Sequence, residues 1–165
     1  MDAKEIIKLL NLKPLPREGG FYRETYRSDV TLSHTLPHDQ YTTGKSAGTA
    51  IYYLVTPDSF SHLHRLPTDE IYHFYLGDQV QMLLLLQDGK SEMVTLGHDI
   101  VHGQKSQAVV PGGTWQGSCL IDNGKWALLG TTMAPGFDPS DYEEPDTNQL
   151  LTTYQGHNDL IKRLI

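Results

Sequence analysis

The sequence is poor in cysteine, in positive charge and in long apolar runs, and each shortage excludes a class of protein. Its single cysteine, Cys119, cannot form an internal disulfide, which predicts a reducing, cytoplasmic location. The thirteen Lys and Arg residues are outnumbered by twenty Asp and Glu, so a formal net charge of −7 disfavours a nucleic-acid backbone as partner. The longest apolar stretches, such as Met82 to Leu86, are far shorter than the roughly 20 residues that cross a bilayer. We therefore expect neither a nucleic-acid partner nor a membrane span.

The 165 residues suit a single domain over 1–165, since domains run to about 100–200 residues. An Asp near the start and an apolar stripe predict a short helix over about 2–11. A second stripe, with basic residues toward its end, predicts a C-terminal helix over about 157–165. We expect both helices to pack against the remainder, which forms a barrel over about 19–137.

Between the helices the pattern predicts short strands. Segments rich in Val, Ile, Thr and Tyr are separated by turn residues, and they cover 21–27, 49–55, 60–64, 70–76, 80–86, 91–96, 107–110 and 125–133. The turn residues include Gly77-Asp78, Asp88-Gly89 and Asn123-Gly124, which predict three tight hairpins. We interpret 28–46 as a long surface loop and 138–148 as an exposed connection. The fold class is therefore all-β, with antiparallel strands in a sandwich or closed barrel.

The most informative stretch for chemistry is the His-x-His of His62 and His64. Residues two apart in a strand share a face, so both imidazoles should point the same way, and the next strand should bring Glu70 beside them. Tyr72 has the same parity as Glu70 and should face the same side. Two histidines and an acid suit Fe, Mn, Ni or Zn, and they equally suit metal-free acid–base catalysis. The histidines could also simply form hydrogen bonds in a wet barrel mouth.

This stretch resembles the first motif of the cupin superfamily, in which His-x-His is followed by Glu and, seven positions later, Gly. Glu70 and Gly77 match that interval, although the distance from His64 to Glu70 is one residue longer than usual. The second motif has Pro-x-Gly and then a histidine ligand, whereas Pro111-Gly112-Gly113-Thr114-Trp115 is followed here by Gln116. The resemblance therefore implies one of two sites. We favour a pocket without a cofactor, in which Gln116 binds a polar ligand, and the alternative is a divalent transition metal held by His62, His64 and Glu70.

A narrower resemblance extends over most of the chain. Four ordered blocks, at 18–28, 69–78, 109–117 and 134–137, are similar to the cupin-5 family, also called DUF985. That family is similar in fold to the dTDP-4-dehydrorhamnose 3,5-epimerases. The resemblance implies an antiparallel double-stranded β-helix, the cupin jelly roll, that commonly forms a homodimer. It leaves the biochemical role largely open.

The segment Gly20 to Glu24 also resembles the epimerase stretch that contacts the nucleotide part of the substrate. Glu24 matches the acid of that stretch, and Gly19 stands where its arginine belongs. Arg23 and Arg27 should share one strand face, where they could bind an anionic ligand group or only form salt bridges.

Three functions remain open at this point, and all of them need a small-molecule ligand. The favoured one is a metal-independent isomerase or epimerase that acts on a sugar-like or carbonyl-bearing polar substrate. The others are a metal-dependent cupin enzyme and a non-catalytic ligand-binding module. The expected catalytic residues are His62, His64, Glu70 and Tyr72, and the expected substrate-binding residues are Arg23, Glu24, Trp115 and Gln116.

Overall fold

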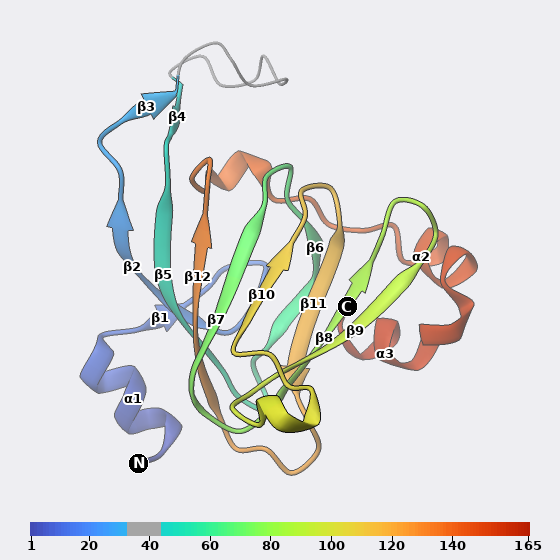
Figure 1. Ribbon diagram of the computed structural model, residues 1–165, viewed down its shortest axis with the longest axis horizontal. Helices are drawn as coiled ribbons and strands as arrows, with labels where there is room; N and C mark the ends of the chain where they lie inside the picture. Colours follow the sequence, from blue (N-terminus) through green and yellow to red (C-terminus); the bar gives the residue numbers. More distant parts are fainter. Residues whose placement is uncertain (33–43) are drawn as a thin grey trace.

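The computed structural model describes residues 1–32 and 44–165, and two β-sheets face each other within it (Figure 1). The larger sheet has the order β1 (Lys13–Pro14), β2 (Phe21–Arg27), β5 (Thr49–Val55), β12 (Ala127–Met133), β7 (Glu70–Gly77) and β10 (Gln107–Val110). The smaller sheet has the order β6 (Ser61–Arg65), β11 (Trp115–Leu120), β8 (Val80–Leu85) and β9 (Ser91–Leu96). Every pairing between these strands is antiparallel. The expected antiparallel jelly roll with short terminal helices is confirmed.

The main core fills the space between the two sheets. Along β7 the inward positions Glu70, Tyr72 and Phe74 are all buried, so Tyr72 does share a face with Glu70 as expected. Met82 from β8 packs into the same cluster from the smaller sheet. Glu70 is thus a carboxyl group placed at the end of an otherwise apolar row.

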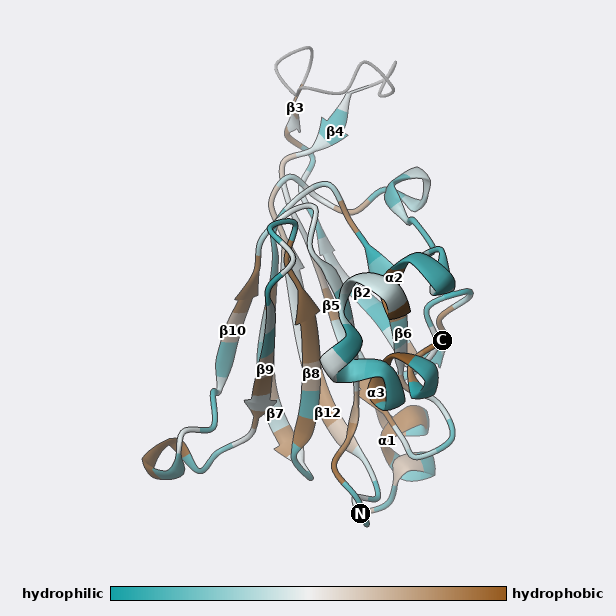
Figure 2. Ribbon diagram, turned by 90° about the vertical axis from the view of Figure 1, so that its right-hand side faces the viewer, coloured by the Kyte–Doolittle hydropathy of each residue, from teal (hydrophilic) through white to brown (hydrophobic). Residues whose placement is uncertain are grey.

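Helices cover the outer faces of both sheets. Helix α1 (Ala3–Leu10) begins with a capping box between Asp2 and Glu5, and its Ile6 packs on the larger sheet. Helices α2 (Thr147–Thr153) and α3 (Asn158–Arg163) lie over the smaller sheet (Figure 2). The shorter 3-10 turns are η1 (Ile100–His102), η2 (Pro139–Asp141) and η3 (Gln155–His157). In the described part of the chain, no helix is both long and apolar enough to cross a membrane.

Several expected elements need correction. Of the three turns expected to close hairpins, only Asp88-Gly89 does so, between β8 and β9. Gly77-Asp78 and Asn123-Gly124 instead carry the chain from one sheet to the other, because the strands on either side of them belong to different sheets. Strand β11 was not expected, since its Gln, Gly and Ser residues show no alternation of apolar and polar side chains.

Two segments expected to be irregular contain regular structure. Within 28–46, β3 (Thr31–Leu32) pairs with β4 (Lys45–Ser46), and residues 33–43 of that expected loop lie outside the described residues. The connection expected over 138–148 buries Asp141 and Tyr142, and α2 begins at Thr147. This connection therefore packs against the barrel instead of lying in solvent.

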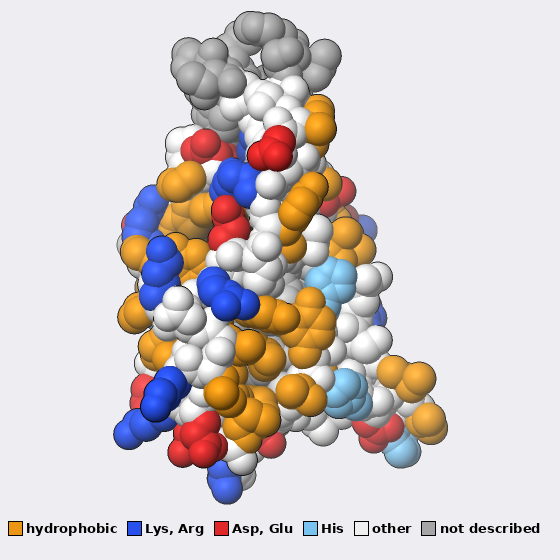
Figure 3. Space-filling model, turned by 90° about the vertical axis from the view of Figure 1, so that its left-hand side faces the viewer, with side chains coloured by type: hydrophobic (Ala, Val, Ile, Leu, Met, Phe, Trp, Pro, Cys, Tyr) orange, Lys and Arg blue, Asp and Glu red, His pale blue; other side chains and the backbone are white. Residues whose placement is uncertain are grey.

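The outer face of the larger sheet carries exposed apolar side chains. Tyr26 is 57% exposed, Tyr75 is 40% exposed and Val109 is 54% exposed. Figure 3 views the molecule from the side on which β2 lies in Figure 1, and it shows hydrophobic side chains gathered over the middle of that side.

Candidate functional site

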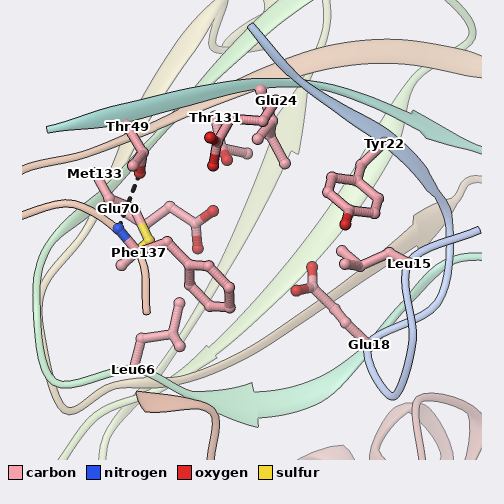
Figure 4. Close-up of a pocket in the computed structure, with 11 residues that line it drawn as sticks. Leu15, Glu18, Tyr22, Glu24, Thr49, Leu66, Glu70, Thr131, Met133 and Phe137 are labelled. Carbon is pink, nitrogen blue, oxygen red and sulfur yellow. Dashed lines mark hydrogen bonds between the residues drawn. The ribbon is translucent and has the colours of Figure 1, made fainter. Parts of the chain in front are cut away.

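A hollow lies inside the barrel against the inner face of the larger sheet (Figure 4). Its volume is about 50 Å³. Because one water occupies about 10–15 Å³ on this measure, the hollow holds roughly four water-sized groups. Much of its wall is apolar, from Leu15, Ile51, Leu66, Met133 and Phe137. The carboxyl groups in the wall belong to Glu18, Glu24 and Glu70.

Glu18 enters the hollow from the loop between β1 and β2. Gly19 has a φ of 89°, and a Cβ built on it would lie 2.3 Å from the carbonyl oxygen of Phe60. Only glycine allows the loop to approach the start of β6 so closely. This approach turns the Glu18 side chain inward, where the Ser61 hydroxyl donates to its Oε1 over 3.2 Å.

Glu70 enters from the first position of β7 and is 6% exposed. Its Oε2 accepts a hydrogen bond of 2.8 Å from the Nε2 amide of Gln116 in the facing sheet. Figure 4 shows the side chains of Glu18 and Glu70 extending toward one another across the hollow. The two carboxyl groups therefore flank one small hollow.

Burial changes the acidity of both carboxyl groups. Desolvation raises the pKa of Glu18 to about 7, against the opposing effect of the Ser61 hydrogen bond. Desolvation also raises the pKa of Glu70 to about 7, and the negative charge of Glu18 adds to that increase. Both groups can therefore gain or lose a proton near neutral pH, as general acids and bases require.

His64 lies beside this pair and is fully buried, with 0% exposure. Its Nδ1 is 2.8 Å from the carbonyl oxygen of His62, so Nδ1 carries the hydrogen and Nε2 is the acceptor. Burial lowers the pKa of His64, which keeps the ring neutral. Nε2 lies 3.9 Å from Oε2 of Glu18, which is too long for a hydrogen bond.

His62 does not join His64 and Glu70, which corrects the expected convergence of the three residues. Gln116 pairs with His64 and Ser118 pairs with Ser61, so β6 holds one extra residue against β11. This bulge reverses the alternation of β6, so Ser61 and His64 both reach Glu18. The Nδ1 of His62 instead lies 3.3 Å from the carbonyl oxygen of Arg17, in a separate pocket.

The residues present do not fit the metal site that the cupin motif implies. Across residues 1–32 and 44–165, no three His, Cys, Asp or Glu side chains are grouped closely enough to hold a metal ion. His62 is turned away, and Gln116 uses its amide N–H on Glu70. No chemical step is therefore assigned to a metal at this site.

The expected arginine pair also separates. The ladder between β2 and β5 shifts register between Glu24 and Tyr26, so Arg23 and Arg27 face opposite sides of the sheet. Arg27 binds both carboxylate oxygens of Glu24, at 3.0 Å and 2.7 Å. Arg23 stacks over Tyr52, 5.4 Å from the ring centre, and does not line the hollow.

The remaining expected residues lie in the lining of the hollow, in the buried interior behind it, or on the surface. Gln116 is 2% exposed and contacts Glu70, whereas Trp115 stacks with Arg65 at 4.6 Å in a different surface pocket. Tyr72 is 1% exposed and lies in the core near the two acids without lining the hollow. Glu24 lines the hollow, as a substrate-binding role would require.

Sequence reasoning did not identify Glu18, Ser61 and Tyr142 as site residues. The Tyr142 ring stacks on His64 with 5.1 Å between ring centres and 13° between planes. The segment around it is anchored by the Arg65–Glu143 and Arg17–Glu144 ion pairs. The Gly19-Gly20 pair after Glu18 was a signal for a sharp inward turn, whereas the stacking of Tyr142 has no local signature.

Comparisons with known proteins agree with this architecture. The model of the family described as "Cupin superfamily (DUF985)" matches residues 4–144. An uncharacterized protein of Saccharomyces cerevisiae, YML079W, is 33% identical over 135 residues, which cover 76% of this chain and 67% of the yeast protein.

Solved structures extend the similarity to the whole fold. A hypothetical protein from Leishmania major has a TM-score of 0.87 and 33% identity, over 99% of this chain and 98% of its own. Protein SO0799 from Shewanella oneidensis has a TM-score of 0.84 and 31% identity, over 99% of this chain and 97% of its own. A Bacillus subtilis oxalate decarboxylase variant has a TM-score of 0.54 and 13% identity, over 94% of this chain and 38% of its own, which shows a shared fold alone.

Proposed function

The chain belongs to the DUF985 family of the cupin superfamily, and we propose that it binds a small carbonyl-bearing molecule. The proposed reaction transfers a proton within that molecule, as a metal-independent isomerase or epimerase does. The observation that supports this proposal is the pair formed by Glu18 and Glu70 across one buried hollow. Proton removal beside a carbonyl needs a base and an acid on either side of the substrate.

Glu70 suits the role of base. The Gln116 amide and the Thr131 hydroxyl both stabilise its charged form, while burial keeps its pKa at about 7. As base, Glu70 takes the proton from the carbon next to the carbonyl, and the electron pair of the C–H bond forms the double bond of an enediol. The carbonyl oxygen gains a proton in the same step.

Glu18 suits the role of acid. Burial raises the pKa of Glu18 to about 7, so a large share of it is protonated at neutral pH. As acid, it donates its proton to the carbonyl oxygen and is regenerated when the enediol collapses. Return of the proton from Glu70 to the former carbonyl carbon, while the other hydroxyl loses its proton to Glu18, gives an isomer. An epimer forms when a proton from water reaches the original carbon on the opposite face, while Glu70 releases its proton to solvent and the enediol hydroxyl returns its proton to Glu18.

Solvent-deuterium incorporation tests this function. Incubation of candidate hydroxyketones or ketosugars in deuterated water should label the carbon beside the carbonyl, and Glu70→Gln should slow labelling by about 100-fold. Glu92→Gln is the matched control, because Glu92 pairs with Lys105 on the surface. Binding of such compounds without any labelling would indicate a non-catalytic ligand-binding module instead.

We also propose that the chain forms a homodimer through the outer face of the larger sheet. The support is the exposure of Tyr26, Tyr75 and Val109 on strands of this sheet. A second copy placed on this face would cover side chains that water would otherwise contact, and it would leave the hollow on the inner face open to ligand.

A further inference from the structure

Among the described residues, no positively charged side chain lines the hollow. Its lining includes three glutamates and no lysine or arginine. Two basic side chains contact lining residues without lining the hollow themselves. Arg27 is engaged by Glu24 and by the carbonyl oxygen of Phe137, and Lys13 lies 5.2 Å from the ring centre of Tyr22. An anionic ligand would therefore enter without a partner charge, at a high desolvation cost.

Two further hydrogen-bond acceptors lie behind the lining of the hollow, on side chains next to Glu18 and Glu70. Nε2 of His64 and Oε1 of Gln116 are buried and have no partner among the described residues. Nε2 is an acceptor because Nδ1 carries the ring hydrogen, and Oε1 can only accept. His64 faces Glu18, and Gln116 donates its amide N–H to Glu70, whose ionised oxygens accept as well.

The Tyr22 hydroxyl supplies a donor on the opposite wall. Figure 4 shows the Tyr22 side chain pointing into the hollow on the side of Glu18. A ligand that matches this wall must donate several hydrogen bonds at one end and accept one or two beside Tyr22 and protonated Glu18. Hydroxyl groups next to a carbonyl have this arrangement, and phosphates and carboxylates have the opposite one.

We propose that the ligand of this hollow is a small, uncharged hydroxycarbonyl compound, an unphosphorylated sugar of about the size of glyceraldehyde. The proposal rests on the proposed function, in that the hollow between Glu18 and Glu70 is the ligand site. The volume of about 50 Å³ sets the size, and the absence of lining lysine and arginine in the described residues sets the charge. The Glu70 carboxylate in the lining, with the unpartnered acceptors of His64 and Gln116 behind it, favours a ligand with hydroxyl donors.

Direct binding measurements with matched probes test the inference. The neutral probes are glyceraldehyde and dihydroxyacetone, and the anionic probes of similar carbon skeleton or size are glycerate, glyceraldehyde 3-phosphate and oxalate. Titration calorimetry and melting shifts at pH 7.5 should show saturable binding of a neutral probe, with each anion bound at least about tenfold more weakly. An anion that binds as tightly as the neutral probes would overturn the proposal, as would the absence of binding by both neutral probes.

Variants and deuterium labelling together distinguish the proposed ligand class from the proposed reaction. The double variant Glu18→Gln with Glu70→Gln should bind glyceraldehyde about tenfold more weakly and glycerate more tightly, because the repelling charges are gone. Unchanged discrimination in that variant would overturn the proposal. Selective binding of neutral probes without deuterium labelling would support the ligand class while the proposed reaction fails. Labelling of only phosphorylated substrates would support the reaction and overturn the ligand class.

Discussion

Ser61 and His64 lie three residues apart in β6, and both side chains reach the carboxyl group of Glu18. The Ser61 hydroxyl donates to Oε1 over 3.2 Å, and Nε2 of His64 lies 3.9 Å from Oε2. A regular strand would place residues three apart on opposite faces, so the bulge in β6 creates this arrangement. The polar half of the candidate site depends on that one extra residue.

The bulge predicts that the two histidines differ in importance. His64→Ala should reduce ligand binding and deuterium labelling by about tenfold or more, because it removes an acceptor beside Glu18. His62→Ala should change either quantity by less than about twofold, because His62 lies in a separate pocket. Equal losses in the two variants would show that both imidazoles act together, as the original His-x-His interpretation requires.

The buried acids predict that stability falls as pH rises. The folded-state pKa of Glu18 and of Glu70 is raised from 4.5 to about 7, so the folded state binds more protons than the unfolded state between these values. The stability that these groups contribute is therefore fully present below about pH 4.5 and is lost as the pH rises to about 7, by about 3 kcal/mol for a single such acid. Glu18→Gln should flatten the dependence in urea unfolding between pH 5 and 8, and Glu92→Gln should not.

The stacking on His64 predicts a role for Tyr142 in holding the segment that covers the site. Tyr142→Ala removes a buried ring and should lower the free energy of unfolding by about 2 to 4 kcal/mol. Tyr142→Phe keeps the ring and should stay within about 0.5 kcal/mol of the parent protein. Equal unfolding midpoints for the Ala and Phe variants would contradict this role.

The positions of the three expected metal ligands, His62, His64 and Glu70, predict that a chelator does not affect stability or ligand binding. Within the described residues, His62, His64 and Glu70 do not form a group that can hold a metal ion. Treatment with a strong chelator should therefore leave the melting temperature and the binding of glyceraldehyde unchanged. A stoichiometric transition metal in gently purified protein, with loss of binding on chelation, would restore the metal-dependent alternative.

The exposed face of the larger sheet predicts a dimer that a single charge disrupts. Val109→Asp should shift the mass measured by light scattering from dimer to monomer, because it buries a charge in the proposed interface. Val30→Asp is the control, since Val30 is 63% exposed on the connection between β2 and β3. A monomeric parent protein would contradict the proposed homodimer outright.

Local sequence was sufficient to predict an element wherever contacts between near neighbours in the chain determine its structure. Asp2 and Glu5 cap α1 through contacts within one turn, and Asp88-Gly89 closes β8 onto β9 through its own backbone preferences. The same type of signal failed at Gly77-Asp78, because positive φ permits a sharp turn without choosing the sheet that the next strand joins. That choice depends on which apolar faces meet in the core.

The sequence alone predicted the jelly roll, from motif resemblance, and the shared face of Glu70 and Tyr72, from strand alternation. It also identified His64 and Gln116 as candidate site residues. Tertiary structure alone decided that Glu18 completes the site, that His62 turns away and that Arg23 and Arg27 part. The physical reason is that one extra residue in a strand reverses every side chain beyond it, and whether a ladder accepts that residue depends on packing across the whole barrel.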